Sequence, residues 1–371
     1  MEKIIIPRPL QIVVDDLGWF CPNDERTTFG PARTAMTRYH VAADYEAVNY
    51  LGEQLGMMIN CAFIVGEWDP DNRLRSVKGL SKYGDGWDNA AHLDSKEMAR
   101  CVEVINSSPY IDFALHGLFH NYYRGDGVYH NSDYYYHDGD ALVMIPEAEV
   151  RHRLDCYFDI VKYYGIKKEI NSFVPPSYYA RLGEMSRILS DYGILYSSTT
   201  FRSLRCEDSE RPAVVAVENG IITLDRSFNQ IPWNEPSTDF SRIPYAEGIF
   251  GMHWPNLLHH DPARSHEIVD GAVSYCKARA HDFGTVLARD MKYCATQSLC
   301  YRFATVTERD GEYIVDLSGV PDAPGKGDFF TVSLKSAPRS VEGGEIRLAS
   351  DMGEFKNYDI YPSGSFVKIK I

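Results

Sequence analysis

Strand-like and helix-like segments alternate along most of this chain, and that alternation is the strongest constraint on its fold. Short apolar runs are each followed by a stretch with the apolar spacing typical of an amphipathic helix. Repeated units of this kind predict a parallel sheet with crossover helices, in an open or barrel form. The predicted strands cover residues 12–16, 57–65, 110–116, 170–176, 194–198 and 247–254, and the predicted helices cover 44–56, 95–106, 147–165, 180–193 and 261–284.

The pattern changes near residue 297. Downstream segments such as "EYIVDL", "DFFTVSL" and "SFVKIKI" alternate in polarity between turns and show no helical spacing. A chain of 371 residues is also longer than one ordinary core requires. We therefore predict an α/β domain over residues 1–296 and a small all-β, sandwich-like domain over residues 297–371.

The acidic composition restricts the partners that this protein can have. A formal net charge of −14 argues against nucleic acid and anionic membranes, whose phosphates need basic surface. No segment approaches the ~20 apolar residues of a membrane span, and residues 1–11 do not resemble a secretory signal. The 8 cysteines are scattered without a CxxC pair, which predicts buried reduced thiols. We expect a cytoplasmic protein.

Two adjacent aspartates, Asp15 and Asp16, follow the first predicted strand in "IVVDDLGWF". Two carboxylates side by side repel each other, so folding stability alone does not account for them. In α/β sheets and barrels, the carboxyl ends of the strands carry the chemistry. The alternative is an ordinary loop or cap pair. Their position at a strand end favours a functional site.

The motif "HGLFH" follows the strand predicted at 110–116 and places His116 and His120 four residues apart. This spacing predicts both imidazoles on one face of a helical turn, with Gly117 allowing a tight bend. Two imidazoles and one carboxylate form a facial triad suited to a divalent metal, zinc in the first instance. The second carboxylate would then be left to act as a base. Two exposed histidines without a metal are the alternative.

The segments "VVDDLG", "HGLFH", "FVPP" and "FGMHW" occur in this order and resemble the polysaccharide deacetylase (NodB-homology) superfamily. The resemblance covers roughly residues 8–290. It implies a metal-dependent N-deacetylase on a distorted (β/α) barrel. Carried over to this chain, it implies Asp16, His116 and His120 as metal ligands, Asp15 as catalytic base and His253 as general acid.

Some residues depart from the pattern of that superfamily. Its groove motif usually contains an arginine that orients the base aspartate, whereas Ser172 and Phe173 offer none. Gly251 stands where a bulky aliphatic residue usually precedes the acid histidine. Asp225 and Trp233 are the candidates for the Asp-Trp motif of the superfamily.

A carbohydrate groove is predicted around this centre. The loop over residues 121–140 is dense in Tyr, Asp and Asn, whose aromatic faces and polar groups suit a sugar, although a solvent loop or a dimer contact fits equally well. His253 is either the acid or a core histidine packed on Trp254. The predicted substrate-binding residues are Pro175, Pro176, Trp254 and Tyr122. The partner would be a carbohydrate or a small amide, and a homo-oligomer remains open.

Three functions fit these residues. The first is a metal-dependent hydrolase that removes an acyl group, most simply acetyl, from an N-acylated sugar or related amide. The second is a carbohydrate-binding protein that kept the fold and lost turnover. The third is a glycoside hydrolase with paired carboxylates, which fits poorly because adjacent aspartates do not readily flank a glycosidic bond.

Overall fold

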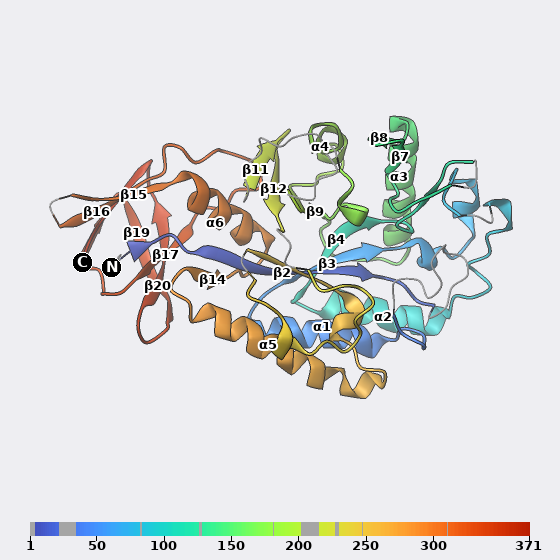
Figure 1. Ribbon diagram of the computed structural model, residues 1–371, viewed down its shortest axis with the longest axis horizontal. Helices are drawn as coiled ribbons and strands as arrows, with labels where there is room; N and C mark the ends of the chain where they lie inside the picture. The colour runs from blue at the N-terminus through green and yellow to red at the C-terminus, as the bar shows by residue number, and fades with distance from the viewer. Residues whose placement is uncertain are drawn as a thin grey trace.

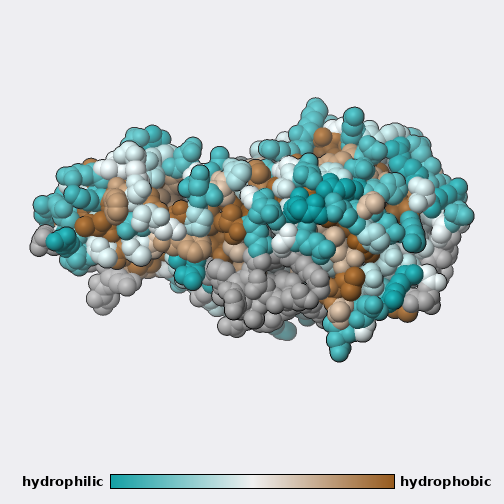
Figure 2. Space-filling view, turned by 90° about the horizontal axis from the view of Figure 1, so that it is seen from above, coloured by the Kyte–Doolittle hydropathy of each residue, from teal (hydrophilic) through white to brown (hydrophobic). Residues whose placement is uncertain are grey.

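A mixed α/β fold is seen in the computed structural model of the chain. The structure describes residues 4–21, 35–81, 84–125, 128–180, 182–201, 215–226, 230–246, 248–309 and 311–371. The molecule is elongated, with the main sheet and most helices toward one end and the C-terminal strands at the other (Figure 1). Figure 2 shows the same elongated outline from above, with hydrophilic side chains around much of its rim.

The main sheet is an open, curled half-barrel of nine strands. Its order is β11-β12-β10-β9-β4-β3-β2-β13, and β14 pairs with β2 off this path. Among the described residues the end strands β11 and β13 do not pair with each other, so this sheet does not close. The strands are β2 (Arg8–Leu17), β3 (Ile59–Ile64), β4 (Ile111–Gly117), β9 (Ser172–Phe173), β10 (Tyr196–Thr199), β11 (Val215–Glu218), β12 (Ile221–Asp225), β13 (Ile249–His253) and β14 (Thr285–Leu287). All of these pairings are parallel except that of β11 with β12, as the strand–helix alternation predicts.

Strand β2 lies next to the end strand β13 and pairs with three strands of this sheet. Its first residues pair with β14 and its later ones with β13, while β3 lies on the other side. Ile12 and Val14 join one apolar cluster and Val13 joins another, because successive side chains of a strand point to opposite faces. Helices α1 (Ala42–Leu55), α2 (Ser95–Ser107) and α5 (Ser265–Ala280) lie together on one side of the sheet (Figure 1).

Helix α6 (Met291–Phe303) runs across the boundary predicted at residue 297. Nine of its residues are buried, so the helix lacks the one-sided apolar pattern that marks an amphipathic helix in a sequence. Its apolar side chains, among them Met291 and Leu299, belong to the cluster around Val13. Residues 298–303, which the sequence assigned to strand-rich structure, are therefore helical and pack on the main sheet.

The C-terminal strands form two four-stranded sheets. One has the order β15-β16-β21-β18 and the other β1-β17-β20-β19. The short strand β1 (Ile4–Ile5) pairs antiparallel with β17, so the N-terminal segment joins a C-terminal sheet rather than the predicted α/β unit. The strands are β15 (Thr305–Arg309), β16 (Glu312–Asp316), β17 (Phe330–Leu334), β18 (Ser340–Glu342), β19 (Gly344–Asp351), β20 (Lys356–Pro362) and β21 (Phe366–Lys370).

Several smaller predictions can be compared with the structure. The Asn219-Gly220 turn joins β11 to β12 with both residues at positive φ, the conformation that an Asn-Gly pair favours in a hairpin. Seven cysteines are described as buried thiols without a disulfide, and Cys206 lies outside the described residues. Among the described residues no helix has the length and apolar character needed to cross a bilayer.

The remaining helices are α3 (Glu147–Tyr163) and α4 (Leu182–Ser190). The tyrosine-rich loop forms two short hairpins, β5 (Tyr122–Tyr123) with β6 (Tyr129–His130) and β7 (Tyr135–Asp138) with β8 (Ala141–Met144).

Gly18 follows β2 and lies in close contact with the end of β3. This contact generates a stability prediction. Its φ is +101°, and a Cβ there would lie 2.0 Å from the carbonyl oxygen of Ile64. Gly18→Ala should therefore lower the free energy of unfolding by about 2 kcal/mol or more. Gly56→Ala is the matched control, since Gly56 also has positive φ (+62°) but nothing lies within 4 Å of its Cβ position. Urea unfolding monitored by tryptophan fluorescence compares the two variants, and equal losses would contradict the steric explanation.

Candidate metal centre

A bulge in β2 brings both aspartates to one site. In the pairing with β3, Asp15 and Asp16 together stand opposite the single residue Ala62. Asp16 takes a left-handed φ of 65°, which non-glycine residues rarely adopt. In a regular strand two neighbouring side chains would point to opposite faces, whereas a bulge re-aims one of them. Both carboxylates are buried at the end of the strand.

The two histidines of "HGLFH" are held by a strand end and a tight non-helical turn. His116 is the extra residue in the pairing of β4 with β3, so this strand also has an irregularity at the site. Gly117 has φ +111° and His120 has φ +59°, which rules out the predicted helical turn. The rings nevertheless meet at a centroid distance of 5.1 Å in an edge-to-face arrangement. The prediction that they lie together was right, although its geometric reason was wrong.

Asp16, His116 and His120 form a group that can hold a metal ion. Each offers one ligand atom, and these atoms lie within 4.8 Å of one another. All three side chains are buried, and His116 Nε2 is 3.4 Å from Asp16 Oδ1. One carboxylate oxygen and two imidazole nitrogens match the donors that zinc and related divalent ions prefer.

Hydrogen bonds to the far nitrogen of each ring favour the same tautomer in both histidines. Nδ1 of His116 is 2.7 Å from the carbonyl oxygen of Val174, and Nδ1 of His120 is 3.1 Å from Asn131 Oδ1. Since both partners are acceptors, each Nδ1 is assigned the proton, and each Nε2 keeps a lone pair. The backbone N–H of Ser177 donates to that lone pair of His120 at 3.1 Å. Metal-binding histidines usually donate their other ring N–H to such an acceptor, and at His120 a metal would take the place of the Ser177 N–H on Nε2.

The charges of the site also favour a cation. Burial by itself favours the neutral imidazole of His116, but the Asp16 carboxylate 3.4 Å away and the negative charge of Asp15 outweigh it and raise the His116 pKa. Two buried carboxylates here face one buried guanidinium, that of Arg226, which leaves an excess of negative charge. A bound divalent ion would compensate this charge, so the residues present fit a metal.

Arg226 was missed by the sequence analysis and pairs with Asp15. Its Nη1 lies 3.0 Å from Oδ1 and 2.9 Å from Oδ2 of that carboxylate. Arg226 directly follows β12, two strands away from the groove segment in which the superfamily has its arginine. Gln230 also donates from Nε2 to Asp15 Oδ2 at 3.1 Å. Arg226 thus lies beside Asp15, where Ser172 and Phe173 offer no arginine.

Gly251 leaves the space that Arg226 occupies. A Cβ at position 251 would lie 2.3 Å from Nη2 of the arginine. A bulky aliphatic side chain there would exclude the guanidinium from its present position. The glycine before His253 and the arginine beside Asp15 are therefore sterically coupled. The signal available in the sequence was the glycine, whose partner could not be identified without the fold.

His253 lies next to the two aspartates. It pairs in register with Asp15 across β13 and β2, and its Nε2 is 3.9 Å from Asp16 Oδ2. Nδ1 is 2.8 Å from the carbonyl oxygen of Ile231 and donates to it. Burial lowers the pKa of this imidazole, and the charges of the two aspartates only partly oppose that effect. The ring is thereby biased toward the neutral form.

A cavity of about 390 Å³ opens onto the centre. Trp233, the candidate for the Asp-Trp motif, lines it, whereas Asp225 accepts a hydrogen bond from the backbone of Phe201 instead. Four of the non-glycine residues with positive φ lie at this site, namely Asp16, His120, Ser177 and Tyr178. The cavity is lined by Asp15, His116, His120, Asn131, Pro175, Ser177, Tyr178, Tyr179, Gln230, Pro232, Trp233 and His253.

Of the four predicted substrate-binding residues, only Pro175 lines this cavity. Pro176 is buried in the turn that follows it. Tyr122 is nearly buried, and its ring faces the guanidinium of Arg153 at 5.5 Å. Trp254 is fully buried and stacks on His40, with ring centroids 4.0 Å apart. The side chains of Tyr122 and Trp254 therefore support neighbouring elements, and aromatic residues at 178, 179 and 233 take the predicted place beside the cavity.

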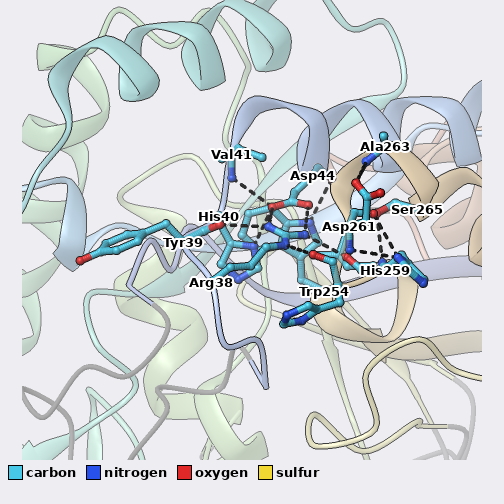
Figure 3. Close-up of polar contacts among 12 residues, drawn as sticks. Arg38, Tyr39, His40, Val41, Asp44, Trp254, His259, Asp261, Ala263 and Ser265 are labelled. Carbon is cyan, nitrogen blue, oxygen red and sulfur yellow. Dashed lines mark hydrogen bonds and ion pairs between the residues drawn. The ribbon is translucent and has the colours of Figure 1, made fainter.

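The Trp254 side of the centre is fixed by a buried ionic cluster (Figure 3). Asp44 accepts two hydrogen bonds from Arg38, at 2.7 and 2.8 Å, and lies 3.2 Å from His40 Nδ1. Burial opposes ionisation of Asp44, but the bonds from Arg38 and His40 outweigh it and lower the carboxyl pKa. Arg38 also donates to the backbone carbonyl of His259. The cluster thus ties the start of α1 to the segment that follows His253.

Comparisons with known proteins give weak similarities to solved structures. No protein-family model matches the chain, and no curated protein does. A 4-alpha-glucanotransferase from Thermococcus litoralis is 10% identical with a TM-score of 0.42, over 76% of this chain and 39% of that enzyme. This chain therefore spans well under half of that enzyme.

Two further solved structures carry names of the class that the sequence motifs resemble. A protein named as a polysaccharide deacetylase from Mycobacterium smegmatis is 13% identical with a TM-score of 0.43, over 82% of this chain and 96% of that one. A protein named as a glycoside hydrolase/deacetylase from Parabacteroides distasonis is 9% identical with a TM-score of 0.42. The match covers 88% of this chain and 78% of that one. Because these TM-scores lie below 0.5, the function is argued below from the geometry of the site alone.

The contact between Gly251 and Arg226 generates a second prediction. Gly251→Ala should displace the guanidinium and lower the free energy of unfolding by about 1–3 kcal/mol, the usual range for overpacking. Gly271→Ala is the control, because a Cβ there meets Phe240 at an ordinary 3.6 Å. Combining Gly251→Ala with Arg226→Met in a double-mutant cycle should give strongly non-additive losses. Additive losses in chemical denaturation would mean that the two residues do not share this space.

Proposed function

We propose that this protein is a metal-dependent hydrolase that removes an acyl group, most simply acetyl, from an N-acylated sugar or a related amide. The observation that carries the proposal is the buried Asp16, His116 and His120 group with a second carboxylate, Asp15, beside it. We expect one divalent ion, zinc in the first instance, at about 2.0–2.2 Å from these three residues.

The proposed reaction divides the work between the ion and the protein. A divalent ion held by Asp16, His116 and His120 would polarise the amide carbonyl and activate a water. Asp15 accepts the proton that this water loses. Arg226 and Gln230 hold its carboxylate from the other side, so the base keeps one orientation. The ion pair also compensates the buried charge of Asp15.

His253 supplies the second proton transfer in this proposal. Its Nδ1 proton is held by the carbonyl oxygen of Ile231, so Nε2 is the atom that faces the two aspartates. When protonated, Nε2 donates a proton to the amide nitrogen as the C–N bond breaks. The products are a carboxylic acid and a free amine, which balances the water consumed.

The cavity suits a ligand about the size of one sugar ring with its acyl group. Its volume is about 390 Å³, toward the small end of ligand pockets. Tyr178, Tyr179 and Trp233 supply aromatic side chains for stacking on a sugar ring, while Asn131 and Gln230 supply amides for its hydroxyl groups. This lining supports a polar, ring-containing substrate.

The two other functions are less well supported. The lack of an arginine at Ser172 and Phe173 favours a binding protein without turnover, but Arg226, directly after β12, pairs with Asp15 instead. A glycoside hydrolase needs two carboxyl groups that flank a bond roughly 5 Å or more apart. Here Asp16 faces the two histidines while Asp15 is engaged by Arg226, so neither is placed as a free acid.

A substrate panel tests the proposed activity. The purified chain, stripped with a chelator and reloaded with Zn²⁺, Co²⁺ or Mn²⁺, is incubated with N-acetyl sugars and small N-acetyl amides. Release of acetate and of a primary amine in equal amounts, dependent on the added metal, is the expected result. Release of a reducing sugar end without acetate would instead indicate glycoside hydrolysis.

The two aspartates should not be interchangeable. Asp16→Asn should lose both metal and activity, because it removes an anionic ligand. Asp15→Asn keeps the shape of the side chain but not its basicity, so it should keep the metal and lose about 10²–10⁴-fold in turnover. Metal analysis beside kinetics distinguishes the variants. If Asp15→Asn removes the metal and Asp16→Asn does not, the roles are reversed.

The acid role of His253 predicts a pH dependence. An acid must be protonated to act, so kcat/KM should fall as the pH rises through the His253 pKa. Burial lowers that pKa, and a nearby cation lowers it further, so the midpoint should lie below the ordinary histidine value of about 6.5. The His253→Gln variant should bind metal and react more slowly. Its kcat/KM should no longer fall with rising pH on the alkaline side of the profile. If kcat/KM of the variant still fell with rising pH in the same way, another group would be responsible for that fall.

A further inference from the structure

The tyrosine-rich loop contains a segment that holds the second histidine of the centre. Asn131 and Asp133 lie two residues apart, between β6 and β7, and both contact His120. The sequence left this loop open as a sugar groove, a solvent loop or a dimer contact. The contacts of Asp133 and Asn131 point to a different role, directed at the metal centre.

Asp133 fixes the backbone of the turn between the two histidines. It is fully buried, and its Oδ1 accepts hydrogen bonds from the backbone N–H groups of Leu118 and Phe119 at 3.1 and 3.2 Å. Its Oδ2 accepts the N–H of His120 at 2.7 Å. One carboxylate thus satisfies three consecutive backbone donors, which no regular secondary structure would satisfy here.

The residues around Asp133 are adapted to its position. A Cβ on Gly117 would lie 2.5 Å from Asp133 Oδ2, so the glycine provides both its φ of +111° and room for the carboxylate. Arg153, also buried, faces Asp133 Oδ1 at 3.5 Å and compensates its charge. Arg153 Nη2 additionally donates to the carbonyl oxygen of Lys78 at 2.8 Å. These contacts leave the turn little freedom to move.

Asn131 fixes the ring of the same histidine. Its Oδ1 lies 3.1 Å from His120 Nδ1 and also accepts the hydroxyl of Tyr129 at 3.0 Å. An acceptor at Nδ1 selects the tautomer with a lone pair on Nε2, where a metal would take the place of the Ser177 N–H, and it orients the ring. Backbone and ring of His120 are therefore both held from residues 129–133.

We propose that residues 129–133 are the positioning segment of the metal centre, in which Asp133 fixes the turn between His116 and His120 and Asn131 fixes the His120 ring. The proposal rests on the proposed function, since it assumes that the two histidines bind a metal. Neither Asn131 nor Asp133 is a ligand. Their effect on the metal passes through His120.

Metal affinity tests the positioning segment without a substrate. The full chain is stripped with a chelator, and its affinity for Zn²⁺ is measured by competition with a chromophoric chelator. Asn131→Ala should weaken Zn²⁺ binding about 10–100-fold, the usual effect of losing a partner of a ligand, while the unfolding temperature of the metal-free chain stays unchanged. Asn131→Asp keeps an acceptor oxygen and should restore most of the affinity. The absorption spectrum of the Co²⁺-loaded protein should change in Asn131→Ala and return in Asn131→Asp.

Asp133→Asn tests the turn itself. The substitution turns one of the two carboxylate oxygens into an NH2 group, which cannot accept a hydrogen bond from the backbone N–H groups of the turn. We therefore expect weaker Zn²⁺ binding together with a lower unfolding temperature. Asp138→Asn is the matched control, because Asp138 is an exposed carboxylate on the same loop and pairs with Arg124. It should bind Zn²⁺ as the parent does. If Asp133→Asn does not fold, the Asn131 variants decide.

The outcomes separate the two proposals. Parent-like Zn²⁺ affinity in Asn131→Ala and in folded Asp133→Asn would overturn the positioning segment while leaving the hydrolase proposal intact. An Asn131→Asp variant as weak as Asn131→Ala would overturn the role of the acceptor. A parent that binds Zn²⁺ but releases no acetate would contradict the proposed reaction alone. A parent that binds no divalent metal would overturn both.

Discussion

The bulge in β2 is the constraint on which the candidate site depends. Without it, Asp15 and Asp16 would point to opposite faces of a buried sheet, and one carboxylate would enter the core. The extra residue and the left-handed backbone of Asp16 bring both to the strand end. A second irregularity at His116 lies across β3. The regular strand β3 thus separates two deformed neighbours, and each of them delivers a residue of the candidate metal group.

The two carboxylates have different surroundings, and that difference defines their roles. Asp15 is engaged by a buried guanidinium and an amide, whereas Asp16 faces the imidazoles of His116 and His253. A buried ion pair is weak evidence for stability, because desolvation opposes the Coulomb attraction. Its presence at Asp15 is better explained by orientation of a functional group. The adjacent pair of acids therefore consists of one charge-compensated group and one that is ready for a cation.

Sequence reasoning predicted the strand–helix order and the residues that gather at the strand ends, because parallel strands deliver their last residues to one edge. It assigned His116 and His120 to a helical turn, since spacing alone does not reveal that Asp133 shapes the turn. It missed Arg226, which reaches Asp15 across 211 residues of sequence and depends on the empty space at Gly251. It placed Trp254 at the substrate, although stacking on His40 buries it. Long-range packing decided each of these cases.

The pairing of β1 with β17 has a consequence for how the chain folds. Ile4 pairs with Leu334, so the partner of the N-terminal strand emerges some 330 residues later in synthesis. At ordinary translation rates of about 5–20 residues per second, that delay is roughly 15–65 s. The short strand β1, which precedes β2, must remain unpaired with β17 for this time. Such a high contact order predicts slow final assembly, with an exposed strand edge that a chaperone would have reason to protect.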